Sequence, residues 1–204
     1  MQRSAFVVSS IAVAVVVCAR VLHGNQDSRA SPVDDPEAYA AYASLLPNEW
    51  TIRVGKAKTL VIQEETATRW DCMPSGEAMQ TTWKPVVDAY RAANAAPHKL
   101  LANQELGIPY QVVPGKAIAL SFDRLIPNGG SDGWSGFYRK YPDSGGYVEM
   151  SAVGFDSAKV RAMVYIGHSC GGLCGGGTHH LLEKVEGVWR AAKIPGLMQC
   201  QWAS

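Results

Sequence analysis

Residues 160–192 read VRAMVYIGHSCGGLCGGGTHHLLEKVEGVWRAA, and this stretch decides the fold class. It holds three runs rich in apolar and β-branched residues, separated by glycine-rich or charged breaks. Short runs of this kind, bounded by turn residues, predict β-strands. We expect strands over 160–166, 178–185 and 188–192, and a fourth one upstream over 147–153. Together they predict an antiparallel four-stranded meander in the C-terminal third of the chain.

The sequence before this meander predicts short helices and a few further strands. Asp35 can cap a helix over 38–46, Pro36 suits its first turn, and Pro47 is expected to end it. Further helices are expected over 85–94 and 134–141, and further strands over 50–54, 59–63, 108–113 and 116–122. The expected fold is therefore α+β, with short N-terminal helices packed on a mostly antiparallel sheet.

The N-terminus carries the pattern of an export signal. Residues Ala5 to Ala19 form an uncharged apolar run, AFVVSSIAVAVVVCA, which ends at Arg20. A run of about 15 residues is long for the core of a signal peptide and short of the roughly 20 that span a bilayer. We therefore expect a signal peptide or membrane-anchor helix over 1–22, a linker over 23–34 and a single α+β globular domain over 35–204.

Composition and charge limit the classes of partner. The chain has 47% hydrophobic residues, a net charge of +1 and no run of lysine and arginine. Nucleic-acid binding domains usually cluster basic residues on one face, so we expect no nucleic-acid partner. Export places the domain outside the cytoplasm, in the periplasm, secreted, or held at the membrane by an uncleaved N-terminal helix. The expected partner is an envelope or extracellular ligand, and no cofactor is expected.

Export also changes how the cysteines are interpreted. In an oxidising compartment, the four cysteines of the domain are expected to form disulfides rather than metal sites or nucleophiles. Four cysteines allow three pairings. We favour a bond between Cys170 and Cys174 across the base of the glycine-rich loop, which leaves Cys72 to pair with Cys200. The other two pairings stay open at this point, and we expect no catalytic residue among these cysteines.

The segment GHSCG at 167–171 matches the G-x-S-x-G pattern of a hydrolase nucleophile elbow. Such an elbow leads from a strand into a helix, and an acidic residue and then a histidine follow it in the chain. Here more glycines follow, which disfavour a helix. No aspartate lies beyond Asp156, and both later glutamates come after the last histidine. The match therefore does not predict an α/β-hydrolase.

Two other chemistries remain as alternatives for the loop at 167–180. Cys170, Cys174, His179 and His180 offer four metal-binding side chains within eleven residues. Neighbouring residues of a strand point to opposite faces, so His179 and His180 do not easily share one ion. The alternatives are a metal-binding module, or a hydrolase or thiol-redox enzyme that pairs one of these cysteines with His168, His179 or His180. We favour a non-catalytic binding or structural domain stabilised by disulfides.

The C-terminal half carries an ordered set of short motifs. They are Trp134-x-x-Phe137-x-x-x-Tyr141-Pro142-x-Ser144-x-Gly146, Ser151-x-Val153-Gly154-Phe155-Asp156, Ala162-x-Val164-Tyr165, Cys170-Gly171-x-Leu173-Cys174-Gly175-x-Gly177, Leu181-Leu182-x-Lys184 and Gly187-x-Trp189. Their order, over about residues 134–190, resembles a widespread group of exported bacterial proteins of unknown function. The resemblance implies an exported α+β domain, and it implies no particular activity or catalytic residue.

Overall fold

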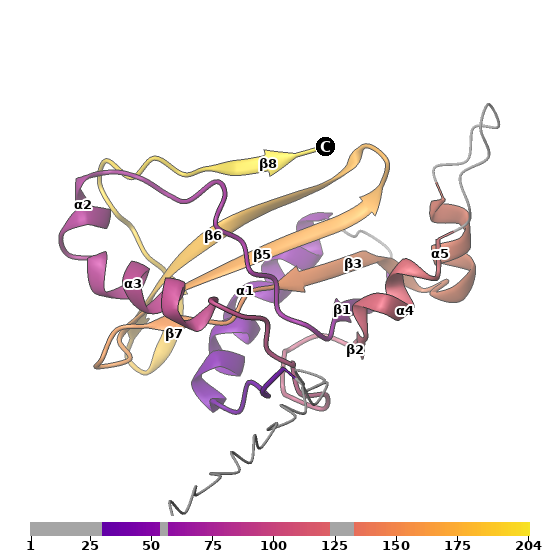
Figure 1. Ribbon diagram of the computed structural model, residues 1–204, viewed down its shortest axis with the longest axis horizontal. Coiled ribbons are helices and arrows are strands. Elements are labelled where there is room, and N and C mark those ends of the chain that lie inside the picture. The colour runs from indigo at the N-terminus through magenta and orange to yellow at the C-terminus, as the bar shows by residue number, and fades with distance from the viewer. Residues whose placement is uncertain (1–29, 54–56, 123–132) are drawn as a thin grey trace, which may run out of the picture.

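The computed structural model describes residues 30–53, 57–122 and 133–204, and this part of the chain has an α+β fold (Figure 1). Five helices accompany one mixed sheet of eight strands in these residues. The helices are α1 (Pro36–Arg53), α2 (Glu77–Gln80), α3 (Lys84–Ala93), α4 (Gly115–Ala119) and α5 (Trp134–Lys140). The strands are β1 (Thr59–Gln63), β2 (Tyr110–Val113), β3 (Ser144–Met150), β4 (Gly154–Phe155), β5 (Arg161–Gly171), β6 (Cys174–Val185), β7 (Val188–Ala191) and β8 (Gln201–Ala203).

The strands of the sheet follow the order β2-β1-β3-β5-β6-β7. Strand β1 runs parallel to both β2 and β3, and all other pairings are antiparallel. Strands β3, β5, β6 and β7 are neighbours in the region where we expected a four-stranded meander. The arrangement is more elaborate than that, because β4 also pairs with β5 and β8 also pairs with β6.

The central strand β5 has both of its faces covered. Residues 162–168 are all buried, although successive side chains of a strand point to opposite faces. Val164 and Ile166 belong to the core cluster that α1 covers, whereas Met163 and Tyr165 belong to the cluster under α3. A strand that packs on both sides reads as a continuous apolar run, which is the pattern MVYI in this sequence.

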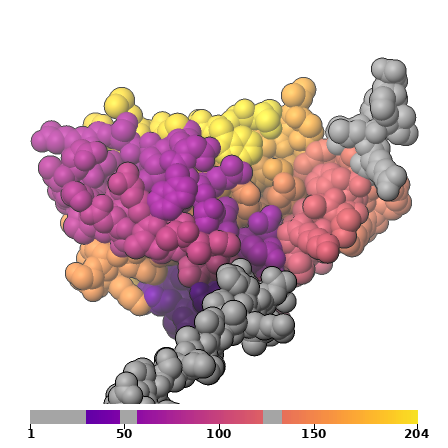
Figure 2. Space-filling model, in the orientation of Figure 1, coloured from indigo at the N-terminus to yellow at the C-terminus, as the bar shows by residue number. Residues whose placement is uncertain are grey.

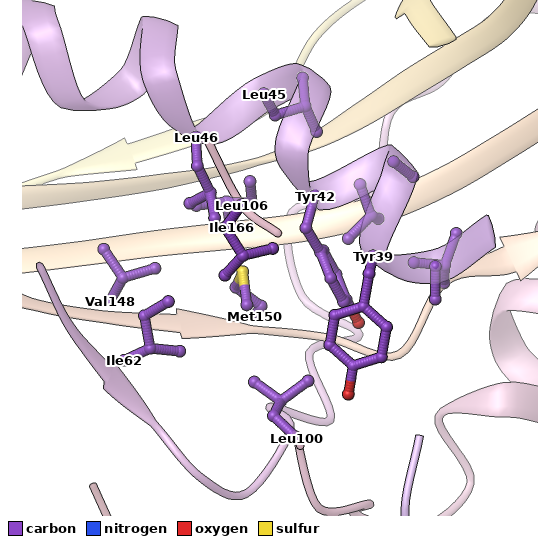
Figure 3. Close-up of a cluster of buried hydrophobic side chains, with 14 of the residues drawn as sticks. Tyr39, Tyr42, Leu45, Leu46, Ile62, Leu100, Leu106, Val148, Met150 and Ile166 are labelled. Carbon is purple, nitrogen blue, oxygen red and sulfur yellow. The ribbon is translucent and has the colours of Figure 1, made fainter. Parts of the chain in front are cut away.

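Helix α1 covers one face of the sheet and lies behind it in Figure 1. Figure 3 shows Tyr39, Tyr42, Leu45 and Leu46 of this helix in one cluster with side chains of the sheet, namely Ile62, Val148, Met150 and Ile166. The hydroxyl of Tyr42, which is fully buried, donates a hydrogen bond to the carbonyl oxygen of Ser151 at 2.8 Å. The buried tyrosine therefore leaves no polar atom without a partner.

The other face of the sheet is covered in two separate places. Near one end, Val86, Val87 and Tyr90 of the amphipathic helix α3 are buried. Helix α3 comes so close to β4 that a Cβ added to Gly154 would lie 2.3 Å from the backbone nitrogen of Tyr90. Near the other end, Phe137 of α5 packs with side chains of α4, β1 and β2. Figure 2 shows orange atoms of the sheet between the magenta α2–α3 region and the coral α4–α5 region.

Several local expectations differ from the structure. Helix α1 does not end at Pro47 but continues to Arg53, so the strand expected over 50–54 is wrong for residues 50–53. A proline removes one backbone hydrogen bond and can kink a helix without ending it. The strand expected over 116–122 is also wrong, because residues 115–119 form the short helix α4 behind Pro114. The carbonyl oxygen of Pro114 accepts the first bonds of that helix, from the backbone N–H groups of Ala117 and Ile118.

Other elements lie where the sequence places them. The strand over 59–63 is β1, and the helices over 85–94 and 134–141 correspond to α3 and α5. The proposed export segment at 1–22 and most of the 23–34 linker lie outside the described residues. The end of that linker contacts the domain, since Val33 donates a backbone hydrogen bond to Lys99. Among the described residues, no helix combines the length and apolar character that a membrane crossing requires.

Candidate functional site

The structure forms two disulfides, with the pairing that we favoured. Cys170 is bonded to Cys174 and Cys72 to Cys200, and the Cα atoms of each pair are 5.0 Å apart. The first bond closes the tip of the β5–β6 hairpin. The second joins the segment before α2 to the segment before β8, 128 residues further along the chain. A bonded cysteine carries no thiolate, so none of the four is a nucleophile in this state.

The histidines of the loop segment do not form one cluster at the hairpin tip. His179 lies opposite Tyr165 on β5, well away from the Gly171–Cys174 pair at the tip. His168 binds the carbonyl oxygen of Gly145 through Nε2 at 2.8 Å. His180 follows His179 on β6, so its side chain points to the other face of the sheet. The described part of the chain holds no group of three or more His, Cys, Asp or Glu side chains that could bind one metal ion.

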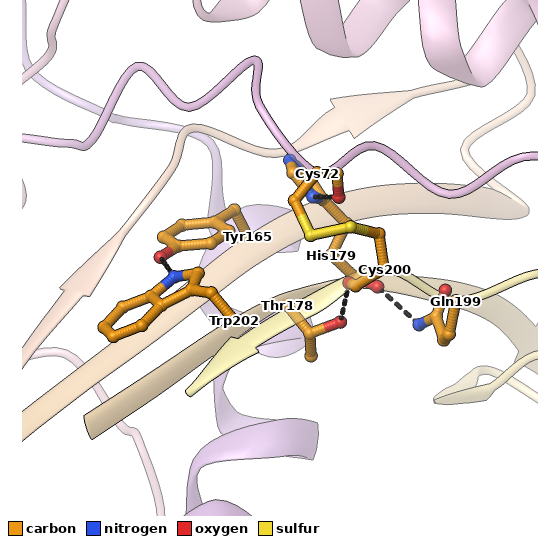
Figure 4. Close-up of a disulfide and its surroundings, with 7 residues drawn as sticks. All are labelled: Cys72, Tyr165, Thr178, His179, Gln199, Cys200 and Trp202. Atoms are coloured by element: carbon orange, nitrogen blue, oxygen red, sulfur yellow. Dashed lines mark hydrogen bonds between the residues drawn. A yellow bond between two sulfur atoms is a disulfide. The ribbon is translucent and has the colours of Figure 1, made fainter. Parts of the chain in front are cut away.

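His179 is a fully buried residue at the Cys72–Cys200 disulfide (Figure 4). Its Nδ1 lies 3.1 Å from the carbonyl oxygen of Cys72, and its Nε2 lies 3.1 Å from the hydroxyl oxygen of Tyr90. A carbonyl oxygen only accepts, so Nδ1 carries a proton toward Cys72, while the Tyr90 hydroxyl lies within hydrogen-bond distance of both Nε2 and the carbonyl oxygen of Arg69. Burial lowers the pKa of His179 and outweighs the hydrogen bonds that favour its charged form. We therefore assign the ring as neutral at pH 7.

A polar chain of side chains crosses the part of the sheet between α3 and α5. The indole Nε1 of Trp202 donates to the hydroxyl oxygen of Tyr165 at 2.8 Å. That hydroxyl lies 3.4 Å from Oε1 of Glu149, which accepts two hydrogen bonds from Arg69, at 2.8 and 3.1 Å. Strands β3, β5 and β8 and the segment before α2 each contribute one of the four side chains. We call these four residues, with Gly167, Gly175 and Gly177 beneath them, the Arg69–Trp202 patch.

The glycines of this patch make room for its aromatic side chains. Gly167 and Gly177 lie directly opposite each other on β5 and β6. A Cβ at these positions would lie 2.6 and 2.3 Å from the hydroxyl oxygen of Tyr165, and one at Gly177 would lie 2.6 Å from Nε1 of Trp202. Because both side chains are absent, the phenol and the indole lie across the strands. The glycine-rich sequence therefore shapes a surface on the sheet as well as a hairpin tip.

The charged side chains of the patch are held by hydrogen bonds and are partly exposed to solvent. The side chain of Arg69 is 42% exposed and that of Glu149 is 18% exposed. The hydrogen bond to Glu149 raises the pKa of the Arg69 guanidinium, so the group stays charged. Burial raises the pKa of the Tyr165 hydroxyl, which stays protonated at neutral pH. Both bonds from Arg69 end on Oε1 of Glu149, and no hydrogen bond within the described residues reaches Oε2.

Three of the four polar residues of this patch were not predicted from the sequence. Tyr165 and the glycines belong to the quoted motifs, whereas Arg69, Glu149 and Trp202 do not. Glu149 did offer a signal, because it is the single charged residue in the run YVEMSAV at 147–153. Arg69 and Trp202 come from segments without a clear pattern, and only the folded chain brings them to Tyr165.

Comparison of the chain with protein-family models, with curated proteins and with solved structures finds no match. The chemistry of the Arg69–Trp202 patch is therefore interpreted from its own geometry. It combines a partly exposed guanidinium, a partly exposed carboxylate and indole, and the buried phenol of Tyr165. Sites that bind small molecules combine apolar or aromatic surface with a few fixed polar groups in the same way.

The neutral state of His179 predicts that stability depends on pH. The folded pKa lies below the value of about 6.5 expected for the unfolded chain. As the pH falls through 6.5, the unfolded chain therefore takes up a proton first, and the free energy of unfolding decreases. We expect the wild type to lose more stability between neutral and mildly acidic pH than the variant His179→Gln, as measured by urea unfolding at both values. Equal losses in the two proteins would contradict the assignment.

The two disulfides are expected to contribute unequally to stability. In the chain-entropy model, a link between residues 128 apart is worth about 5 kcal/mol and one between residues 4 apart about 2 kcal/mol. The double variant Cys72→Ser with Cys200→Ser should therefore lose more unfolding free energy than Cys170→Ser with Cys174→Ser. Guanidinium unfolding of the oxidised proteins measures both losses. A larger loss from the hairpin-tip pair would overturn the ranking.

Proposed function

We propose that the chain is an extracytoplasmic domain of the cell envelope that binds a ligand through the Arg69–Trp202 patch and catalyses no reaction. The observation that carries this proposal is the ion pair of Arg69 and Glu149, which hydrogen bonds hold in place and which is partly exposed to solvent. Neighbouring side chains fix both groups, while a carboxylate oxygen and part of the guanidinium remain open. Surface ion pairs are worth about 0–1 kcal/mol, so this pair contributes little to stability.

Three observations support the extracytoplasmic part of the proposal. The sequence begins with an apolar segment of the length found in signal peptides and short anchors. Disulfides persist in oxidising compartments and are rare in the cytosol, and the four cysteines of the domain are paired in two of them. The order of the C-terminal motifs resembles that of exported bacterial proteins. We propose a location in the periplasm, outside the cell, or at the membrane through residues 1–22.

The state of the candidate residues supports binding over hydrolysis. A cysteine hydrolase at the 167–180 segment needs a free thiolate beside a histidine, whereas a thiol-redox centre cycles through a disulfide and stays compatible with the Cys170–Cys174 bond. Cys170 and Cys174 are bonded to each other, and His179 is occupied by the carbonyl of Cys72 and the hydroxyl of Tyr90. In the patch, the carboxylate of Glu149 is paired with Arg69, and Tyr165 is protonated. These groups suit the recognition of a polar ligand.

The extracytoplasmic location is tested with a reporter enzyme that requires disulfides for activity. We expect residues 1–34 fused to such a reporter to give active enzyme in a bacterial host, because the apolar segment directs export. A fusion in which Val15 and Val16 are both replaced by Asp should be inactive, since two charges interrupt the apolar run. Reporter activity that is absent from the first fusion, or equal in both, would overturn the location.

Ligand binding is tested by sedimentation with insoluble envelope material. The oxidised domain, residues 30–204, should sediment with purified bacterial envelope fragments, and the variant Glu149→Gln should remain in the supernatant. The matched control is Glu64→Gln, since Glu64 also forms a half-exposed ion pair, with Lys99 at 3.2 Å, outside the patch. Sedimentation that both variants lose equally, or that wild type never shows, counts against the patch as the binding surface.

A further inference from the structure

We propose that the ligand of the Arg69–Trp202 patch is a neutral oligosaccharide. This inference rests on the proposed function and names the chemical class of its ligand. Three properties of the patch support this inference. Hydrogen-bond donors lie beside an acceptor, the indole of Trp202 packs on glycines of the sheet, and the positive charge of Arg69 is matched by the negative charge of Glu149.

The polar groups match a pair of neighbouring hydroxyl groups. Oε2 of Glu149 accepts hydrogen bonds only, while the guanidinium of Arg69 donates only and uses two of its five N–H groups on Oε1. A hydroxyl group can both donate and accept, so adjacent hydroxyls on one ring can satisfy the two residues together. The hydrogen bonds that position Arg69 and Glu149 are already formed in the structure. Binding therefore needs little ordering of these side chains, which lowers its entropic cost.

The indole of Trp202 provides an apolar surface beside these polar groups. A Cβ added to Gly175 would lie 3.4 Å from Cζ3 of the indole, and one added to Gly177 would lie 2.6 Å from Nε1. The ring thus rests on strands that have no side chains beneath it, and its N–H bond to Tyr165 fixes its orientation (Figure 4). Trp202 is partly exposed, so it lies at the surface of the patch. The C–H faces of a sugar ring pack well on such a flat aromatic surface.

The balance of charge favours a neutral ligand over an anionic one. The guanidinium of Arg69 is matched by the carboxylate of Glu149 at 2.8 Å. A phosphate or carboxylate ligand that approached Arg69 would meet the negative charge of Glu149, and that of Asp71 nearby. The whole chain has a net charge of only +1, so its overall charge attracts an anion weakly. Neutral hydroxyl groups avoid this repulsion and still use both charged partners.

Isothermal titration calorimetry with defined sugars tests the inference. The probes are chitotetraose, cellotetraose and maltotetraose, each added to the oxidised domain. We expect at least one of them to bind at micromolar to millimolar concentrations. Trp202→Ala and Glu149→Gln should each weaken that binding at least tenfold, whereas Glu64→Gln should leave it unchanged. Trp202→Phe keeps an aromatic face and should lose less affinity than Trp202→Ala, and thermal unfolding of each variant checks that it is folded.

A second arm of the experiment separates this inference from the proposed function. Short unstructured peptides, one basic, one acidic and one neutral, are titrated into the same proteins. A peptide that binds in place of the sugars, with affinity lost in Glu149→Gln, overturns the oligosaccharide inference and leaves the patch as a binding surface. Failure of all three sugars to bind, or equal sugar binding by wild type, Trp202→Ala and Glu149→Gln, also overturns the inference. Sedimentation with envelope fragments then decides the proposed function independently.

Discussion

The antiparallel pairing of β5 with β6 is the interaction on which the rest of the structure depends. It places apolar side chains on both faces of the sheet, so that α1 on one side and α3 on the other each pack against the same two strands. Full burial of one large apolar side chain is worth about 1.5–3 kcal/mol, and β5 contributes several in succession. The same pairing sets Gly167 opposite Gly177 and Tyr165 opposite His179. The core, the surroundings of the disulfide and the Arg69–Trp202 patch thus depend on one strand register, and a slip of one residue would turn every side chain to the wrong face.

The sequence predicted those features that depend on neighbouring residues. The β-branched run at 59–63 gave the bounds of β1, and the short spacing of Cys170 and Cys174 gave their disulfide. Errors arose where local rules compete with tertiary contacts. Pro47 is a helix-ending signal, yet Leu45 and Leu46 before it are buried in the core under α1, and the helix continues beyond it. The Arg69–Trp202 patch was not predictable, because its side chains come from four segments that only the fold brings together.

Most of the quoted motif residues are explained by packing. Gly154 allows α3 to approach β4, and the hydroxyl of Ser151 accepts a hydrogen bond from the backbone N–H of Tyr165. Lys184 and Trp189 both donate to the carboxylate of Glu37 on α1, and the bond from Lys184 is the main reason why the pKa of Glu37 is lowered. The motif residues therefore stabilise the fold. Arg69, Glu149 and Trp202 lie outside them, so chains that share the motifs need not share a ligand.

The bond between Cys72 and Cys200 has a consequence for the timing of maturation. Trp202 lies two residues beyond Cys200, on a strand that pairs with β6 through only three residues. So short a strand is weakly held by its own hydrogen bonds, and the disulfide fixes the chain next to it. Cys72 is likewise close in sequence to Arg69, at the opposite side of the patch. One oxidation step therefore anchors both ends of the patch, which couples its completion to formation of the Cys72–Cys200 bond rather than to synthesis of the chain.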